Sequence, residues 1–131
     1  MSGHSPGRGQ GKPERYMQPS LLMALLDGPS YGYELAGRIA DYGFIRGDAP
    51  PGMVYRHLRQ MEEEGLVVSR WDAEGEGPAK RVYSLTDEGL DVLDAWVDHM
   101  RRQARRLQEF AASYQERMDG RRAGGGKAKG S

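Results

Sequence analysis

The sequence predicts a mainly α fold that also contains a little β structure (α+β). Three short segments with apolar residues at helical spacing precede two strand-like segments, 66–71 and 81–85, which flank a polar turn. Segment 86–118 then has apolar residues at alternating steps of three and four, a pattern typical of a long helix that pairs with another helix. This order predicts a winged helix-turn-helix with a two-stranded β wing, followed by a long C-terminal dimerisation helix.

Length and composition exclude several classes of function. With 131 residues, the chain can form one domain plus tails. It has no cysteine, which excludes disulfides, thiolate metal sites and thiol nucleophiles. The sequence contains no phosphate-binding loop, nucleophile–base pair or His and carboxylate metal spacing, so we expect neither an enzyme nor a cofactor or metal site. No apolar run approaches the roughly 20 residues that span a bilayer. The N-terminus has no secretory pattern, so we expect a soluble, cytoplasmic protein without membrane contact.

The formal net charge of zero conceals an uneven distribution of charge. Residues 1–16 carry +2, residues 99–131 carry +6 and residues 17–98 carry −8. Basic ends indicate contact with a polyanion. The acidic middle argues against a uniformly basic binding surface.

Changes in composition divide the chain into four segments. Residues 1–15 are rich in Gly, Ser, Pro and charge and predict a disordered tail. Residues 16–86 contain the predicted winged helix-turn-helix domain, and residues 87–119 the C-terminal dimerisation helix. Residues 120–131 predict a second disordered tail, which is basic and Gly-rich, because Gly120 is a plausible helix stop.

Glycine and proline residues set the expected limits of the three short helices. The first begins near Tyr16 and ends at Gly28-Pro29, and the second runs from about residue 31 to 42 before Gly43. The third runs from about Pro51 to Glu64 and is closed by Gly65. Helical spacing predicts that the inward positions of the three helices are Leu21, Leu22, Leu25, Leu26, Leu35, Ala36, Ile39, Ala40, Val54, Leu58 and Met61.

The outward face of the third helix admits two interpretations. A turn of about 100° per residue places Arg56, Arg59 and Gln60 opposite the apolar positions. These side chains could be a solvated polar surface. They could also reach phosphates and base edges of DNA, because arginine can bond a guanine edge with two hydrogen bonds.

The long C-terminal segment carries a continuous apolar seam. Thr86 is a good N-cap, and the acidic residues that follow it suit the positive end of a helix dipole. A helix of this length spans about 45 Å, more than the rest of the chain can cover. The seam could pack within one chain, but we expect it to form a homodimer through Leu93, Val97, Met100, Ala104, Leu107, Ala111 and Tyr114.

Four stretches of the sequence resemble the PadR-type winged-helix transcriptional regulators. They read YGYEL at 31–35, PGMVY at 51–55, LRQMEEEGLV at 58–67 and GPAKRVYSLTDEG at 77–89. The resemblance implies a ligand-responsive homodimeric repressor whose C-terminal helices pair and whose third helices enter successive major grooves of a pseudo-palindromic operator. Carried over position by position, it places at the DNA Tyr33, Gly52, Met53, Tyr55 and Arg56, with Lys80 and Arg81 from the wing.

Two further expectations concern an effector and the wing. Trp96 and Phe110 flank the seam, and Trp96 with the seam residue Met100 could line a cleft for a small apolar or aromatic effector. Filling the interface is the commoner role of such aromatic residues. Acidic residues 72, 74 and 76 occupy the wing tip, so we expect modest DNA affinity with a shallow dependence on salt. The rival interpretation is a winged-helix module for protein interaction or effector binding without DNA binding.

Overall fold

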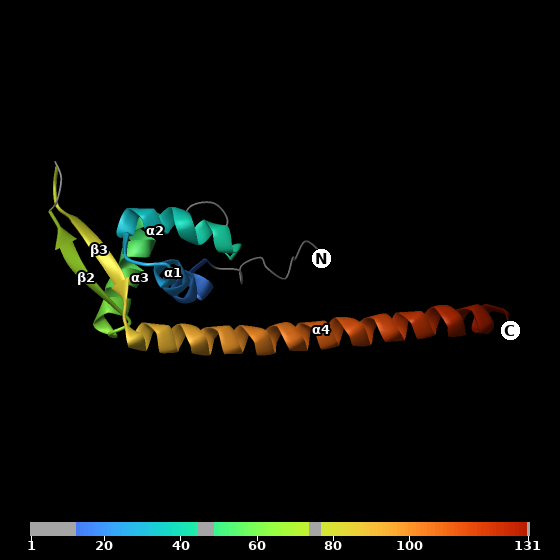
Figure 1. Cartoon of the computed structure of the whole chain (residues 1–131). Helices are drawn as coiled ribbons and strands as arrows, with labels where there is room; N and C mark the ends of the chain where they lie inside the picture. The colour runs from blue at the N-terminus through green and yellow to red at the C-terminus, as the bar shows by residue number, and fades with distance from the viewer. Residues whose placement is uncertain (1–12, 45–48, 74–76, 131) are drawn as a thin grey trace. The chain divides into compact units, whose positions relative to one another are not determined.

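A computed structural model of the chain describes residues 13–44, 49–73 and 77–130 (Figure 1). The chain forms two compact units, Met1–Asp94 and Ala95–Ser131, so that the boundary falls within the last helix. The elements along the chain are η1 (Pro13–Tyr16), α1 (Met17–Leu26), β1 (Ser30–Tyr31), α2 (Gly32–Arg38), η2 (Ile39–Tyr42), α3 (Pro51–Glu63), β2 (Val67–Asp72), β3 (Lys80–Leu85) and α4 (Asp87–Gly130). The predicted mainly α winged helix-turn-helix with a long last helix is confirmed.

The core of the first unit lies where α1, α2 and α3 pack beside the sheet (Figure 1). The predicted apolar faces are largely buried, although Leu26 is half exposed and Ala36 and Ala40 are only partly buried. The predicted second helix is divided, because its last turn tightens to the 3-10 helix η2. Gly43 ends it with a φ of 82°, a left-handed conformation that glycine adopts without steric cost. Core residues with almost no exposed surface are Met17, Leu21, Leu22, Leu35, Ile39, Val54, Leu58 and Val67.

The sheet has three antiparallel strands in the order β1-β3-β2. The predicted hairpin is present, and its register runs from Val67↔Leu85 to Asp72↔Lys80. The third strand, β1, was not predicted, because its two residues are too few to show a period-two pattern. It pairs Tyr31 with Val82 of β3 and thereby ties the start of α2 to the wing.

The start of α4 is fastened to the turn between α3 and β2. The Thr86 hydroxyl accepts a hydrogen bond from the Gly89 backbone N–H (3.0 Å) and donates one to the carbonyl oxygen of Gly65 (2.7 Å). The predicted N-cap is therefore confirmed. A Cβ at Gly89 would overlap the carbonyl oxygen of Leu66, so only glycine permits this close approach.

The C-terminal end of α4 and the N-terminal tail differ from the predicted boundaries. α4 continues to Gly130 rather than ending at Gly120, because Gly120 keeps the backbone conformation of a helix and not the positive φ of a stop. Of the predicted tail 1–15, residues 1–12 lie outside the described residues, and η1 begins at Pro13. Within the described part of the chain, no helix is both long and apolar enough to cross a membrane.

Candidate nucleic-acid interface

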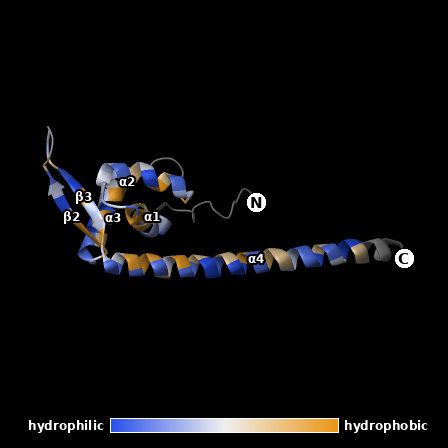
Figure 2. Cartoon of the chain, in the orientation of Figure 1, coloured by the Kyte–Doolittle hydropathy of each residue, from blue (hydrophilic) through white to orange (hydrophobic). Residues whose placement is uncertain are grey.

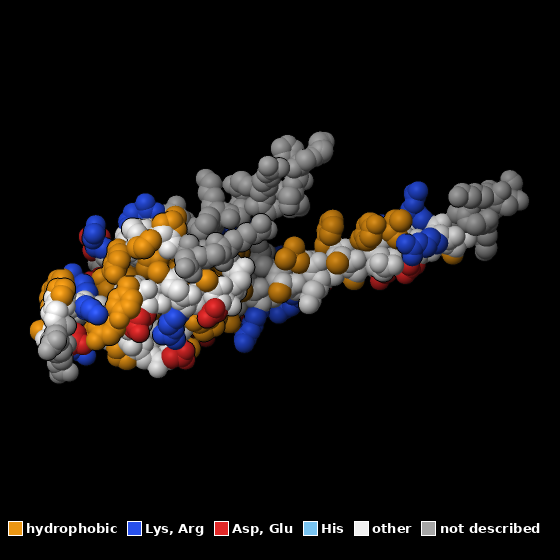
Figure 3. Space-filling view, turned by 90° about the horizontal axis from the view of Figure 1, so that it is seen from above, with side chains coloured by type: hydrophobic (Ala, Val, Ile, Leu, Met, Phe, Trp, Pro, Cys, Tyr) orange, Lys and Arg blue, Asp and Glu red, His pale blue; other side chains and the backbone are white. Residues whose placement is uncertain are grey.

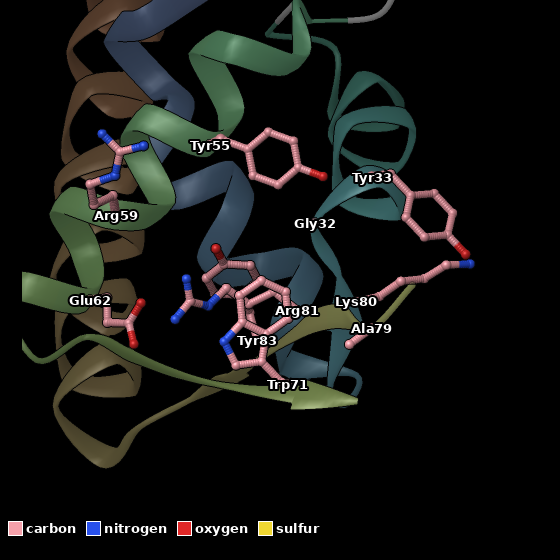
Figure 4. Close-up of a pocket in the computed structure, with 10 residues that line it drawn as sticks. All are labelled: Gly32, Tyr33, Tyr55, Arg59, Glu62, Trp71, Ala79, Lys80, Arg81 and Tyr83. Atoms are coloured by element: carbon pink, nitrogen blue, oxygen red, sulfur yellow. The ribbon is translucent and has the colours of Figure 1, made fainter. Parts of the chain in front are cut away.

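A cleft of about 430 Å³ lies between α3, the wing and the first turn of α2 (Figure 4). We call it the wing cleft. Five of the nine residues predicted to meet DNA line it, namely Tyr33, Tyr55, Arg59, Lys80 and Arg81. The other five lining residues are Gly32, Glu62, Trp71, Ala79 and Tyr83. The remaining predicted residues lie outside the lining, where Gly52, Arg56 and Gln60 are exposed and Met53 is half-buried.

Local sequence explains how α3 presents its polar face. Pro50 is the N-cap and its carbonyl oxygen accepts hydrogen bonds from the backbone N–H groups of Met53 (3.0 Å) and Val54 (3.2 Å). The helix buries its apolar side against the core and leaves Arg56, Arg59 and Gln60 exposed, as predicted. This face is therefore accessible to a partner.

Tyr55 depends on a glycine in the neighbouring helix. A Cβ at Gly32 would overlap the Tyr55 ring, so the ring can lie against the backbone of α2 only because residue 32 has no side chain. Figure 4 shows Tyr55 extending from α3 toward the first turn of α2. The Tyr55 side chain keeps 38% of its surface exposed, which leaves it available at the cleft.

The two basic residues of the wing both rest on aromatic rings. The Lys80 Nζ atom lies 5.2 Å from the centroid of the Tyr33 ring and 5.8 Å from that of Tyr31. The Arg81 guanidinium lies 4.8 Å from the centroid of the Trp71 ring, its cross-strand partner. Such distances are typical of cation–π contacts, which restrict where a flexible basic side chain points.

Three residues were not predicted from the sequence: Trp71 and Glu62 line the cleft, and the Tyr31 ring lies near Lys80. Trp71 is 61% exposed in a polar hairpin, and an exposed tryptophan in such a strand was the available signal. Glu62 lines the cleft and accepts a hydrogen bond from the Ser69 hydroxyl (2.8 Å). That bond joins α3 to β2. It also holds one carboxylate in the cleft that contains the cationic side chains of Arg59, Lys80 and Arg81.

His57 lies beside this face and is half-buried. Burial lowers the pKa of His57, and the neighbouring Arg56 guanidinium lowers the pKa further. Both causes disfavour the protonated imidazole.

Acidic residues at the wing lie only partly within the described chain. Glu74 and Glu76 lie outside the described residues. Asp72, at the end of β2, accepts a hydrogen bond of 2.6 Å from the Tyr31 hydroxyl. This hydrogen bond is the main cause of the raised pKa of Tyr31, because it favours the protonated phenol.

The predicted seam on α4 combines a buried start with exposed apolar side chains further along. Leu93 is buried, Val97 and Met100 are half-buried, and Ala104 and Ala111 are exposed. Leu107 is 71% exposed, and Phe110 beside the seam is 77% exposed. Figure 2 shows hydrophobic residues recurring along the helix, and Figure 3 shows hydrophobic side chains on its surface. The half-buried Trp96 lies edge-on to the His99 ring, with their centroids 6.3 Å apart.

Comparison with known proteins gives consistent matches. A model of the transcriptional regulator PadR-like family matches residues 21–95. The chain is 33% identical over 79 residues to a probable transcriptional regulator of Mycobacterium tuberculosis, an alignment that covers 60% of this chain and 41% of that protein. The curated Bacillus subtilis protein named negative transcriptional regulator PadR is matched over 46% of its length. The chain thus spans less than half the length of these two relatives.

Two solved structures of PadR proteins are similar in fold to this chain. A PadR family transcriptional regulator from Eggerthella lenta has a TM-score of 0.65 at 28% identity, covering 75% of this chain and 83% of that one. Bacillus subtilis PadR, solved in complex with operator DNA, has a TM-score of 0.56 at 25% identity, covering 63% and 46%. Since the family model matches more than half of the residues, the chain belongs to the PadR-like family of transcriptional regulators.

Proposed function

We propose that the protein is a sequence-specific DNA-binding transcriptional regulator. The observation that carries this proposal is the wing cleft, which gathers Arg59, Lys80 and Arg81 beside the exposed face of α3. Lysine and tyrosine side chains at its rim suit phosphate oxygens and would set the register on the duplex. Arg56 and Arg59 suit guanine edges, where each good bidentate pair contributes about 1–3 kcal/mol of discrimination. The solved complex of Bacillus subtilis PadR with operator DNA supports the choice of partner.

The acidic charge of residues 17–98 limits how the protein can approach DNA. Glu62 places a carboxylate within the cleft, and Asp72 lies at the end of β2, next to the turn of the wing. We therefore expect a small number of phosphate contacts and a correspondingly shallow dependence of affinity on salt.

The experiment is a binding titration of the purified protein against duplexes tiled across its own promoter, at about 50 mM and 200 mM salt. One duplex should bind about a thousandfold more tightly than a scrambled duplex of the same composition. Arg59→Ala should reduce this ratio about tenfold or more, whereas Arg70→Ala, on the wing outside the cleft, should leave the ratio unchanged. Equal binding of all duplexes, or no binding at the lower salt concentration, would contradict the proposal.

We also propose that the protein acts as a homodimer through α4. Leu107 and Tyr114 are predicted seam residues whose exposure in a single chain would be relieved by a second copy. Two paired helices would present two α3 helices to successive major grooves of a pseudo-palindromic site, about 34 Å apart.

We further propose that the protein is a repressor that responds to a ligand. The name of Bacillus subtilis PadR, a negative transcriptional regulator, supports repression. Trp96, beside the seam, and Met100, within it, are half-buried and are the candidate effector contacts. In the Trp71→Phe variant, Trp96 is the one remaining tryptophan of the chain. Titration of this variant with an apolar aromatic dye should change its fluorescence and release DNA. An unchanged spectrum and unchanged DNA binding would remove the effector site at Trp96.

The second candidate function is a protein-interaction or effector-binding module that does not bind DNA. The net charge of −8 over residues 17–98 favours it. The same titrations separate the two functions, because this module would bind no promoter duplex at either salt concentration.

A further inference from the structure

Tyr31 is held between the wing and the first turn of α2. Its backbone pairs with Val82 in the sheet, and its N–H donates a hydrogen bond to the Glu34 carboxylate (3.1 Å). Its hydroxyl donates a hydrogen bond to the carboxylate of Asp72, 41 residues further along the chain (2.6 Å). With the backbone and the hydroxyl both bonded, the ring has little freedom to rotate.

The Tyr31 ring forms a stacked pair with Tyr33. Their centroids are 5.6 Å apart and their planes differ by 12°. The Lys80 ammonium lies within 6 Å of both centroids, so one cation is shared by two rings. Figure 4 shows the Lys80 side chain reaching the end of Tyr33 at the mouth of the wing cleft.

This arrangement has a consequence for binding an anion. A lysine side chain has four rotatable bonds, and immobilising it at a phosphate normally lowers affinity through lost entropy. Two aromatic faces that already restrict Lys80 would reduce that loss. Tyr31 is half-buried, whereas Tyr33 is 55% exposed and can itself meet a partner.

We propose that Tyr31 is a positioning residue for DNA binding, which acts by holding Lys80 at the mouth of the wing cleft for a backbone phosphate. The inference rests on the proposed DNA-binding function and assigns a role to a residue outside the predicted contact set. Trp71, beneath Arg81, provides the corresponding support for the second wing cation.

The test is a double-mutant cycle measured by DNA titration. Tyr31→Leu and Lys80→Ala should each lower DNA affinity about fivefold to tenfold at about 0.1 M salt. Each should also reduce the slope of log affinity against log salt concentration by about one for every wing that contacts the DNA. The double variant should bind no more weakly than Lys80→Ala alone, because both changes remove the same contact. Arg59→Ala is the matched control on α3, and its effect should combine multiplicatively with that of Tyr31→Leu.

A conservative variant distinguishes the effect of losing the Tyr31 ring from the effect of disturbing the fold. Tyr31→Phe keeps the ring and should retain most of the affinity that Tyr31→Leu loses, with circular dichroism confirming that all variants are folded. If Tyr31→Leu does not fold, the proton resonances of Lys80 in the free wild-type protein provide the test instead. Multiplicative effects of Tyr31→Leu and Lys80→Ala, or an unchanged salt slope in Tyr31→Leu, would overturn the proposal.

A measurement without DNA distinguishes this inference from the proposed function. Ring currents of the two tyrosines should shift the Lys80 ε-methylene proton resonances upfield in the free protein, and Tyr31→Leu should reduce the shift. An upfield shift with no binding of any duplex would refute DNA binding while leaving the tyrosine support in place. Resonances at random-coil positions would overturn the support itself.

Discussion

The contact between Gly32 and Tyr55 decides where one cleft residue lies. Because a Cβ at residue 32 would overlap the Tyr55 ring, Gly32→Ala should displace the ring from α2. We expect DNA affinity to fall about tenfold and stability by about 1–3 kcal/mol, the usual cost of overpacking. Urea unfolding and DNA titration measure the two effects.

Gly37 provides the matched control for this substitution. It lies in the same helix, and a Cβ there would meet nothing within 4 Å. Gly37→Ala should therefore raise stability by about 0.5–1 kcal/mol, as alanine does in a helix interior, and leave DNA binding unchanged. Similar losses of affinity in both variants would show that Tyr55 is not the cause.

His57 makes the stability of the first unit depend on pH. Burial and then Arg56 lower its folded-state pKa, whereas in the unfolded chain the pKa is about 6.5. Protonation therefore favours the unfolded state. The stabilisation is complete above about pH 6.5 and is lost as the pH falls from there toward the folded-state pKa.

Urea unfolding between pH 8 and pH 5 measures this dependence. Wild type should lose stability over the lower part of that range, and His57→Gln should lose less. Identical pH profiles for the two proteins would contradict the assignment to His57.

At the scale of the element, the first turn of α4 is held against the turn between α3 and β2. Thr86 caps the helix and bonds to the Gly65 carbonyl, while Gly89 lies against the backbone of Leu66. Gly89→Ala should destabilise the first unit by about 2–4 kcal/mol, because the new methyl group meets a carbonyl oxygen rather than a flexible side chain.

Gly120 tests whether this cost is specific to the first turn of α4. It lies in the same helix with nothing near its Cβ position. Gly120→Ala should be neutral or slightly stabilising. Thermal unfolding of both variants decides the matter, and equal melting temperatures would show that the approach of Gly89 to Leu66 is unimportant.

At the scale of the whole molecule, the proposed assembly through α4 would allow two wing clefts to act on one operator. Leu107→Glu places a charge in the predicted seam and should convert a dimer to a monomer at micromolar concentration, because a buried unpaired charge is strongly unfavourable. Affinity for a two-half-site duplex should fall at least tenfold, since the second half-site no longer binds as part of the same particle.

Ser113→Glu is the control for the dimer prediction. Ser113 is exposed on α4 and lies off the apolar seam, so the same charge there should leave sedimentation and DNA binding unchanged. A wild-type protein that sediments as a monomer at these concentrations would exclude the paired-helix arrangement.

Local sequence patterns were sufficient to predict most of the fold. Val54, Leu58 and Met61 mark the inner face of α3, and their spacing also places Arg56 and Arg59 outward. The Thr86 cap and the hairpin were predictable because each depends on residues close in sequence. Gly120 was misinterpreted, because a glycine can stay helical when its neighbours favour the helix, and no local signal separates that case from a stop.

The candidate site was only half predictable. Tyr33, Tyr55, Arg59, Lys80 and Arg81 were identified from the outward face of α3 and from the family resemblance, and the structure brings them to one cleft. Tyr31 and Trp71 were missed, because their role depends on partners in other strands or far along the chain.

The sequence by itself determined the order of elements, the apolar faces and the family, because these depend on spacing and on short motifs. Only the tertiary structure decided which polar side chains meet across the wing cleft, how Tyr31 reaches Asp72, and why residues 32 and 89 must be glycine. The physical reason is that such contacts join residues distant in the chain, and they form only after helix and strand faces have packed into one core.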